Sequence, residues 1–373
     1  MTTSLLFYVQ HLLGIGHVYR ARRICDALHG AGFGLTLVTG GLPVKILAEA
    51  PFPVVQLPPL RTSGTDFAGL VDDNGKPAGE DYMTRRRETL LGLAVDIRPD
   101  LVITEAYPFG RRQMRHELTP FIRFLKDRGD AKLFASIRDI LQENRKPGRD
   151  AETVNLLNTL YDGVLVHGDP RIAKLADTFP LAAEIAIPVH HTGMVAPPAP
   201  PTAPVSNEVL VSAGGGAVGE ALLTAAASAA NDGRLSHLKF VLSTGPNLPG
   251  QARERLRRLL PANAETVPFI ENLPQRLAGC ALSVSQAGYN TVADILVAGT
   301  RAVLVPFATD GETEQTVRSL ALEKLGRTVH LAESGLTPAN LAGKMLQALS
   351  VTPDKTGIDL DGARTTASIL KSL

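Results

Sequence analysis

Three segments of the sequence combine glycines with polar side chains in patterns that bind anions and move protons. They run from His11 to Arg20, from Ser212 to Gly219 and from Ser285 to Asp294. Glycine lets a backbone turn tightly, and the free amides at a helix N-terminus attract negative charge. A histidine, His17, stands inside the first segment. The sequence therefore predicts anion-binding loops together with a group that can take up a proton.

His17 is the predicted general base. Its imidazole can take a proton from an attacking hydroxyl or from water, because the usual pKa of histidine lies near neutrality. The alternative is a histidine that caps the following helix or binds a phosphate without proton transfer. Gly14 and Gly16 precede it and are predicted to contact the same ligand. The loop lacks the third glycine of the dinucleotide-binding fingerprint, so a dinucleotide is a poor fit.

The second and third segments contain stronger anion-binding patterns. Gly214, Gly215 and Gly216 are consecutive, so their amides can form a concave site for a diphosphate at the start of a helix. In the third segment, Thr291 can cap a helix whose first turn holds Asp294. Asp294 then either stabilises its own helix or accepts hydrogen bonds from ribose hydroxyls. The other residues of this loop that we expect to bind the ligand are Gln286, Ala287, Gly288 and Asn290.

A carboxylate and an amide, Glu314 and Gln315, open the helix that follows the loop 306–313. Together they can accept hydrogen bonds from several sugar hydroxyls and donate to others. The alternative is an ordinary acidic first turn of a helix. With a ribose ligand and two diphosphate loops nearby in the sequence, the pair predicts a nucleotide-sugar site.

Apolar runs bounded by turns alternate with amphipathic segments along the chain. Such alternation is typical of parallel sheets with right-handed crossovers, in which ligands bind beyond the carboxyl ends of the strands. The fold class is therefore α/β, with two doubly wound, Rossmann-like units in tandem. The predicted strands are 5–9, 35–38, 101–104, 133–137, 164–166, 209–212, 239–244, 281–285 and 302–305. The predicted helices include 18–29, 117–128, 220–231, 251–260, 291–298 and 314–325.

The chain has 373 residues, which exceeds the roughly 250–300 at which a single hydrophobic core stops growing. Its proline-rich run from Met194 to Pro204 forbids helix and central strand, and so indicates a linker. We predict an N-terminal domain over 1–194, the linker over 195–207 and a C-terminal domain over 208–355. The tail, 356–373, is predicted to form a helix that packs back on the N-terminal domain.

Composition excludes several classes of protein. A net charge of +1 argues against nucleic acid as the main partner, and 44% hydrophobic with 20% charged residues is typical of a globular enzyme. Cys25 and Cys280 lie far apart, and no cluster has metal-ligand spacing, so we expect neither metal nor cofactor. The apolar start Leu5–Val9 is only strand length, and no run of about 18 apolar residues exists, so we expect a cytoplasmic protein.

The N-terminal domain is predicted to choose the acceptor. Glu105 follows a predicted strand and can orient His17, which makes it the second predicted catalytic residue. Arg20, Arg138 and Asp139 are the predicted acceptor ligands, with an Arg138–Asp139 pair as the alternative for the last two. The range 111–149 is rich in Lys and Arg, which indicates a solvated helical face or, alternatively, a contact for an anionic membrane. The range 61–87 is predicted to be a long mobile loop.

The order and spacing of these motifs resemble glycosyltransferase family 28. The resemblance rests on Gly-x-Gly-His at 14–17, Val-Leu-Val-Ser-Ala-Gly-Gly-Gly at 209–216, Pro-Phe-Ile-Glu-Asn-Leu-Pro-Gln-Arg-Leu at 268–277 and the segment 285–326. It covers nearly the whole chain and is strongest between 205 and 330. The best-known member of this family adds N-acetylglucosamine to the lipid-linked muramyl-peptide of the bacterial cell envelope.

The resemblance implies a GT-B fold with two domains facing a cleft, the donor in the C-terminal domain and the acceptor in the N-terminal one. Phe269 and Ile270 match the family segment that lies against the base. Asp294 stands where the family has a glutamate for the ribose, and Glu314-Gln315 stands where it has two glutamines. These departures leave the donor sugar open, although UDP is the nucleotide that the resemblance implies.

We therefore expect a metal-independent glycosyltransferase that moves a sugar from a UDP-sugar to an acceptor hydroxyl, with inversion implied by the resemblance. The acceptor is a glycan, a lipid-linked molecule or a small molecule, and peripheral contact with the inner face of the cell membrane is kept as an option. One alternative is a nucleotide-sugar hydrolase in which His17 activates water, since the Gly14–Arg20 pattern also resembles the first loop of such enzymes. The other is a non-catalytic nucleotide-sugar-binding protein.

Overall fold

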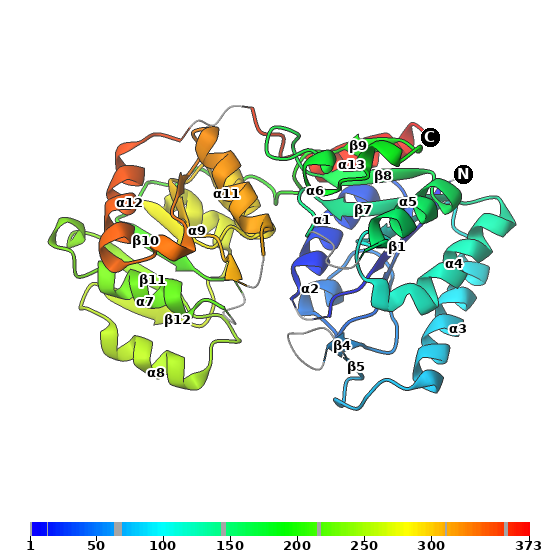
Figure 1. Cartoon of the computed structure of the whole chain (residues 1–373), viewed down its shortest axis with the longest axis horizontal. Helices are drawn as coiled ribbons and strands as arrows, with labels where there is room; N and C mark the ends of the chain where they lie inside the picture. Colours follow the sequence, from blue (N-terminus) through cyan, green and yellow to red (C-terminus); the bar gives the residue numbers. More distant parts are fainter. Residues whose placement is uncertain are drawn as a thin grey trace. The chain divides into compact units, whose positions relative to one another are not determined.

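The computed structural model describes residues 2–12, 14–62, 69–142, 147–214, 218–309, 312–353 and 357–373 (Figure 1). The chain divides into two compact units. The N-terminal unit contains Met1–Pro170, Lys174–Val195 and Asp361–Leu373, and the C-terminal unit contains Arg171–Ala173 and Ala196–Leu360. The chain therefore leaves the N-terminal unit after Val195 and its last segment returns to it at Asp361.

The N-terminal unit is built on a parallel seven-stranded sheet with the order β3-β2-β1-β6-β7-β8-β9. Strand β1 has β2 on one side and β6 on the other, so the strand order reverses there, and such a reversal is where ligands bind in open α/β sheets. The strands are β1 (Ser4–Val9), β2 (Gly34–Thr39), β3 (Val54–Gln56), β6 (Leu101–Glu105), β7 (Lys132–Arg138), β8 (Gly163–His167) and β9 (Val189–His191). A short antiparallel pair, β4 (Arg61–Thr62) and β5 (Leu70–Val71), lies outside this sheet.

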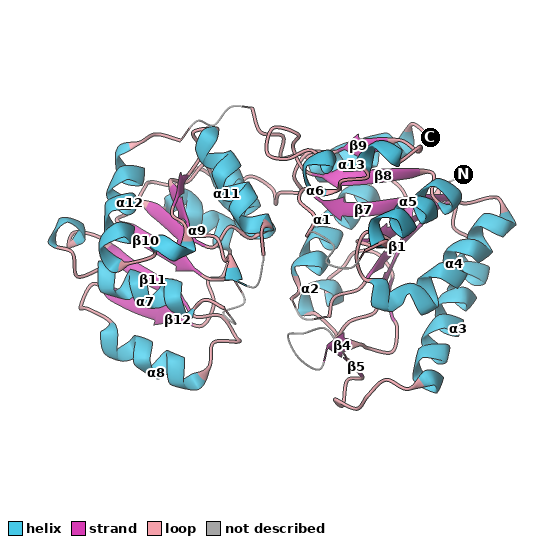
Figure 2. Ribbon diagram, in the orientation of Figure 1, coloured by secondary structure: helices cyan, strands magenta, loops and turns pink. Residues whose placement is uncertain are grey.

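Helices cover both faces of this sheet (Figures 1 and 2). On one face, α1 (Gly16–Gly30) packs beside the terminal helix α13 (Gly362–Lys371), and both contribute to one apolar cluster with β1 and β2. On the other face, α3 (Glu80–Ile97), α4 (Arg115–Arg128) and α5 (Arg149–Leu160) bury leucine and phenylalanine side chains. The short helices α2 (Lys45–Ala48) and α6 (Leu175–Thr178) complete the unit, with single 3-10 turns at Arg112–Met114 and Ala182–Glu184.

The C-terminal unit repeats the design with a parallel six-stranded sheet of order β12-β11-β10-β13-β14-β15. Its strands are β10 (Glu208–Ser212), β11 (Lys239–Ser243), β12 (Ala264–Val267), β13 (Leu282–Ser285), β14 (Ala302–Leu304) and β15 (Val329–His330). Its helices are α7 (Glu220–Ala229), α8 (Gly250–Leu259), α9 (Leu273–Gly279), α10 (Tyr289–Ala298), α11 (Glu314–Lys324) and α12 (Pro338–Ser350) (Figure 2). Alanine-rich α7 packs closely on the sheet together with α8 and α12. The predicted α/β class with two doubly wound sheets is confirmed.

One prediction about the N-terminal unit is wrong. The range 61–87 was expected to be a loop, but its last part belongs to α3, which begins at Glu80 after the N-cap Gly79. The sequence does not predict this helix because its apolar periodicity is weak: its fully buried face includes Arg86 beside Leu90 and Ala94. A charged side chain there breaks the pattern by which a buried helix is recognised.

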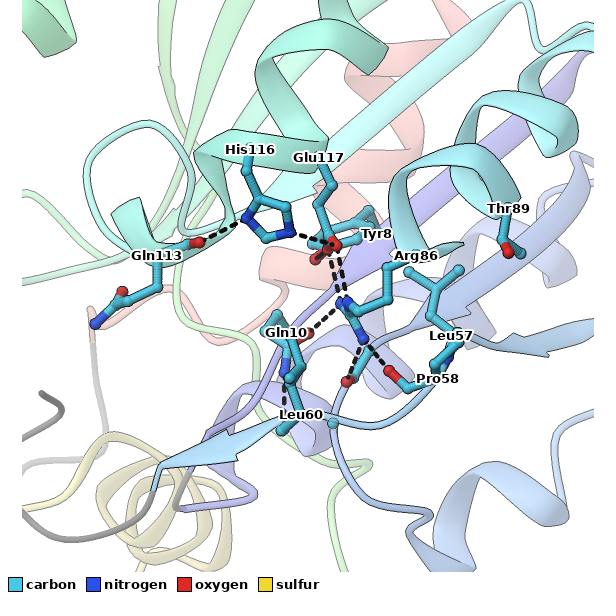
Figure 3. Close-up of polar contacts among 12 residues, drawn as sticks. Tyr8, Gln10, Leu57, Pro58, Leu60, Arg86, Thr89, Gln113, His116 and Glu117 are labelled. Atoms are coloured by element: carbon cyan, nitrogen blue, oxygen red, sulfur yellow. Dashed lines mark hydrogen bonds and ion pairs between the residues drawn. The ribbon is translucent and has the colours of Figure 1, made fainter. Parts of the chain in front are cut away.

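Arg86 forms a buried ion pair with Glu117 of α4 (Figure 3). Arg86 Nε donates to Glu117 Oε2 over 2.8 Å and Nη2 donates to Oε1 over 2.7 Å. Tyr8 of β1 also donates to Glu117, and Arg86 Nη2 donates to the Gln10 side-chain oxygen over 3.0 Å. Burial alone would raise the pKa of the Glu117 carboxyl, but the nearby His116 ring and the charge and hydrogen bonds of Arg86 lower it to about 2.

The same arginine holds the loops that follow two strands. Its Nη1 donates to the carbonyl oxygens of Gly40, after β2, and of Pro58. Gln10, directly after β1, donates its amide to the carbonyl oxygens of His11 and Leu60. The network therefore ties the carboxyl ends of β1 and β2 and the segment 58–60 to the two helices behind them (Figure 3).

Among the described residues, no helix has the length and apolar composition needed to cross a membrane.

Arg86→Met should lower the free energy of unfolding by about 3–5 kcal/mol, because Glu117 would remain buried without its partner. Chemical denaturation of the full chain measures this loss. The double variant Arg86→Met/Glu117→Leu is the matched control, since replacing both charges with apolar groups should recover most of the stability. If Arg86→Met were as stable as the wild type, the ion pair would not contribute to stability as predicted.

Candidate functional site

The two predicted catalytic residues meet at the carboxyl edge of the N-terminal sheet. His17 is the second residue of α1, and Glu105 is the last residue of β6, the strand beside β1. His17 Nδ1 lies 3.0 Å from Glu105 Oε1, and Arg20, one helical turn along α1, donates to the same oxygen. The register of β1 with β6 and the first turn of α1 therefore bring together groups that are distant in the sequence.

The chemistry of these partners fixes where the His17 proton lies. Burial alone would raise the pKa of Glu105, but the Arg20 charge and the His17 hydrogen bond hold it well below its usual range. An ionised carboxylate only accepts hydrogen bonds, and Arg20 Nη2, which lies 3.1 Å from Nδ1, donates to the same Glu105 oxygen, so we assign the His17 proton to Nδ1. Burial and the Arg111 charge lower the pKa of His17 to about 3, so the ring is neutral near pH 7. Nε2 then keeps its lone pair, on a side chain that is 19% exposed.

Two residues outside the predicted set of site residues complete the surroundings of Glu105. Ser136 Oγ donates to Glu105 Oε2 over 2.5 Å and lies 2.9 Å from His167 Nε2. Both residues are fully buried, on β7 and β8. A signal was present, because His167 ends the apolar run Val164–Val166 at the carboxyl end of a predicted strand. A single polar residue at such a position is more often a hydrogen-bonded core residue, so the sequence alone does not distinguish His167 from one.

The loop between β6 and the 3-10 turn at Arg112–Met114 holds a further cation. Ala106 and Arg111 have the left-handed backbone angles φ 67° and φ 55°, which non-glycine residues adopt at an energetic cost. Arg111 Nε donates to the Gln10 carbonyl oxygen over 2.9 Å. Burial and the nearby Arg138 charge lower the pKa of Arg111 to about 10. Arg111 was not among the predicted site residues, although it lowers the pKa of His17.

The three predicted acceptor residues lie in different settings. Arg20 is buried against Glu105 and His17, which makes it part of the catalytic cluster. Arg138 is half-buried at the end of β7. Asp139 is fully buried, and its Oδ1 accepts from the Ile140 amide over 2.9 Å, so this carboxylate helps to shape the turn after β7. Contact with an acceptor stays a prediction for all three.

In the C-terminal unit, Gln315 and Arg318 hold the main chain of Ala287 from both sides. Gln315 Oε1 accepts from the Ala287 amide over 2.9 Å and from the Phe307 amide over 3.2 Å. Arg318 Nη1 donates to the Ala287 carbonyl oxygen over 2.6 Å and Nη2 donates to Glu314 over 2.7 Å. The loops after β13 and β14 are thus joined through α11.

This arrangement changes the interpretation of the pair Glu314-Gln315. The Glu314 carboxylate is buried and paired with Arg318, so it helps to fix the start of α11, and its contact with sugar hydroxyls stays a prediction. Gln315 keeps one free group, because among the described residues its amide nitrogen has no hydrogen-bond partner. The hydrogen bond from the Ala287 amide places Gln315 opposite Ala287, and the spacing of residues in the sequence cannot predict this contact.

The start of α10 also differs from expectation. The helix begins at Tyr289 with Gly288 in an extended conformation as its N-cap, so Thr291 lies inside the first turn and does not cap it. Asp294 lies beyond the first turn and is only 8% exposed, so its suggested role in stabilising the helix N-terminus is wrong. Gln286, Gly288 and Asn290 are half-buried, whereas Ala287 is buried.

The remaining predicted donor residues fall on strand-end loops. Gly214 follows β10 with φ 58°, while Gly215 and Gly216 lie outside the described residues. Gln286 Nε2 donates to the Val218 carbonyl oxygen over 3.3 Å, which links the two glycine loops. Gly16 begins α1, and Gly14 is exposed just before it. Phe269 is 65% exposed after β12, whereas Ile270 is 5% exposed and packs inward.

Within the described ranges, no group of three His, Cys, Asp or Glu side chains is arranged to hold a metal ion. Cys25 and Cys280 are buried free thiols. The polar groups gathered at the two sheet edges are therefore cations, amides, imidazoles and single carboxylates.

Acidification should destabilise the fold through His17 and His167. Burial lowers the pKa of each to about 3, whereas an unfolded histidine titrates near 6.5. Between these values the unfolded chain binds more protons, so the free energy of unfolding falls as pH falls. We expect a loss on the order of 1–2 kcal/mol for each histidine between pH 7 and pH 5, measured by urea denaturation. A double His17→Gln/His167→Gln variant that loses as much stability as the wild type would contradict this assignment.

Gln315→Leu should lower the free energy of unfolding by about 1–3 kcal/mol, because the amides of Ala287 and Phe307 would lose their acceptor. Urea denaturation of the full chain measures the loss. Gln275→Leu, an exposed glutamine on α9, is the matched control and should stay within about 0.5 kcal/mol of the wild type. Equal effects of the two substitutions would show that Gln315 does not hold these loops.

The C-terminal unit matches a known family. Residues 209–355 match the glycosyltransferase family 28 C-terminal domain. Two similar curated proteins are named UDP-N-acetylglucosamine–N-acetylmuramyl-(pentapeptide) pyrophosphoryl-undecaprenol N-acetylglucosamine transferase. The one from Rhodopseudomonas palustris strain CGA009 is 31% identical over 203 residues, 50% of this chain and 55% of its own length. The one from Nitrobacter hamburgensis is 35% identical over 112 residues, 30% of this chain and 29% of its own. These matches thus span between about a third and a half of the relatives.

Solved structures resemble the whole chain. MurG from Acinetobacter baumannii has a TM-score of 0.63 at 16% identity, with both chains covered completely. The calicheamicin glycosyltransferase CalG4 has a TM-score of 0.61 at 19% identity and covers 100% of this chain and 95% of its own. The glycosyltransferase VinC, solved in complex with dTDP, has a TM-score of 0.62 at 14% identity, with 99% and 94% covered. The chain therefore has the GT-B fold and carries a C-terminal domain of glycosyltransferase family 28.

Proposed function

We propose that this protein is a nucleotide-sugar-dependent glycosyltransferase with His17 as its general base. The observation that carries the proposal is the His17–Glu105 contact, in which the carboxylate holds the Nδ1 proton and leaves Nε2 able to accept another. The match of residues 209–355 to a glycosyltransferase domain supports a nucleotide-sugar donor for the C-terminal unit.

The reaction is a direct displacement. The acceptor hydroxyl gives its proton to His17 Nε2 while its oxygen forms a bond to the anomeric carbon of the donor sugar. The bond from that carbon to the diphosphate oxygen breaks, and the electron pair leaves with the nucleoside diphosphate. Attack opposite the leaving group inverts the anomeric centre. The imidazolium that forms is stabilised by the Glu105 carboxylate at 3.0 Å.

The donor side needs groups that hold a diphosphate and a nucleoside. The loop at Gly214 and the N-terminus of α10 at Gly288 supply amides and a favourable field for the leaving diphosphate, so the transfer needs no metal. Phe269 has an exposed ring suited to stacking against a base. Asp294 is assigned to the ribose and the Gln315 amide nitrogen to a sugar hydroxyl.

A UDP-sugar is the proposed donor, because the curated relatives are named for UDP-N-acetylglucosamine. The acceptor is assigned to the N-terminal unit, where the cations Arg20, Arg111 and Arg138 favour a molecule that carries a phosphate or carboxylate. A lipid-linked acceptor would bring the protein to the inner face of the cell membrane from the cytoplasm.

His17→Gln should reduce the turnover number about 10²–10⁴-fold while leaving donor affinity within about twofold, because the substitution removes proton transfer and leaves the C-terminal unit intact. Donor binding is measured by calorimetry with UDP-sugars, dTDP-sugars and GDP-sugars. Turnover is measured as nucleoside diphosphate release with and without glycan, lipid and small-molecule acceptor fractions. His29→Gln, on the exposed side of the same helix, is the matched control and should keep full activity.

Rapid release without any acceptor, dependent on His17, would show that water is the nucleophile and that the protein is a hydrolase. Donor binding with no release in any fraction, together with a silent His17→Gln substitution, would favour a binding protein. A large loss of donor affinity in His17→Gln would recast His17 as a ligand contact.

A further inference from the structure

A buried row of polar side chains leads from His17 across the carboxyl edge of the N-terminal sheet. Glu105 Oε2 is 2.5 Å from Ser136 Oγ, which is 2.9 Å from His167 Nε2. His167 Nδ1 is 2.9 Å from Thr192 Oγ1. Glu105, Ser136, His167 and Thr192 are all fully buried. They lie on or directly after the neighbouring strands β6, β7, β8 and β9, so the sheet itself sets their spacing.

The direction of each hydrogen bond follows from its partners. Ionised Glu105 can only accept, so the single hydroxyl proton of Ser136 is donated to it. Ser136 Oγ must then accept from His167, which places a proton on His167 Nε2. Neutral His167 has its lone pair on Nδ1, and the Thr192 hydroxyl, which also lies 3.2 Å from the Gly193 carbonyl oxygen, donates to it over the shorter distance of 2.9 Å. All the donors in this row therefore point towards Glu105, and such aligned hydrogen bonds strengthen one another.

We propose that Ser136 and His167 are positioning residues for the base His17, acting through Glu105. Ser136 holds the second oxygen of the carboxylate, so that the first oxygen stays aimed at His17 Nδ1. His167 orients the Ser136 hydroxyl. Its Nε2–H donates to a lone pair of Ser136 Oγ, which leaves the Ser136 hydrogen directed towards Glu105. The inference rests on the proposed function, since it names what keeps His17 in the tautomer that the transfer requires.

A packing role alone does not account for this row. The adjoining positions on the same strands are apolar, among them Ala135, Ile137 and Val166, and burying polar groups beside them costs free energy unless every group is bonded. Here the bonds converge on the one carboxylate that contacts His17. The other charged or titratable groups that interact with Glu105 include His17, Arg20 and Cys25 from α1, and Arg111, whose charge also lowers the pKa of His17.

The first test reads the tautomer of His17 without any substrate. Full-length protein labelled with ¹⁵N in its histidine rings shows by NMR which ring nitrogen carries the proton. We expect Nδ1 to be protonated in the wild type, a smaller share of this tautomer in Ser136→Ala, and recovery in Ser136→Thr, which keeps the hydroxyl. Ser319→Ala is the matched control, because it breaks a 2.9 Å contact with His330 in the C-terminal unit and should leave His17 unchanged.

The second test is a double-substitution cycle on turnover. We expect Ser136→Ala to lower the turnover number about tenfold and His167→Leu about threefold, with the KM for donor within about twofold. Because His167 acts through Ser136, the double variant should be no slower than Ser136→Ala alone. His167→Gln, whose amide can still donate to Ser136, should restore most of the activity lost in His167→Leu.

An unchanged His17 tautomer in Ser136→Ala overturns the proposal, and so do fully additive effects of the two substitutions. If Ser136→Ala fails to fold, His167→Leu carries the NMR test, and an unaltered His17 tautomer there overturns the proposal equally. A tautomer shift in a protein that transfers no sugar would leave the positioning role standing and would refute the proposed function instead.

Discussion

Glu105 is a fully buried carboxylate, and the polar side chains around it compensate its negative charge. A buried carboxylate is costly unless cations and hydrogen-bond donors surround it. Arg20 and His17 reach one oxygen from the first turns of α1, while Ser136 reaches the other from β7. This geometry requires β1 to lie beside β6, so the strand order that defines the fold is also what brings His17 to its carboxylate.

The C-terminal unit solves a different problem on a similar sheet. There the recurring contacts go to main-chain atoms: Gln315 accepts from the amides of Ala287 and Phe307, and Arg318 binds the Ala287 carbonyl. A loop held on both its amide and its carbonyl has little freedom left to lose when a ligand binds, and preorganisation of this kind improves affinity. The N-terminal unit thus gathers charged side chains around one buried carboxylate, whereas the C-terminal unit uses side chains to hold the main chain of its strand-end loops.

Much of the architecture could be predicted from sequence because it depends on local patterns. The strand cores and the helices that follow Gly16 and Glu314 show apolar periodicity and glycine loops, and His17 and Glu105 both follow strands in the sequence. The failures concern long-range partners. The buried Arg86 breaks the apolar pattern of α3, and its burial depends on Glu117, which lies in another helix. Likewise, no local pattern in the sequence shows that Gln315 faces Ala287. Ser136 and His167 resemble isolated polar residues until neighbouring strands are aligned.

The stability of the N-terminal unit and the electrostatics of its site are joined at one residue, Gln10. Its side chain accepts from Arg86 and its carbonyl oxygen accepts from Arg111. Arg111 in turn lowers the pKa of His17 and so helps to keep the ring neutral. The ion pair between α3 and α4 therefore does more than hold two helices to the sheet. It fixes the loop after β1, and through that loop the Arg111 cation, which adds to burial in lowering the pKa of His17.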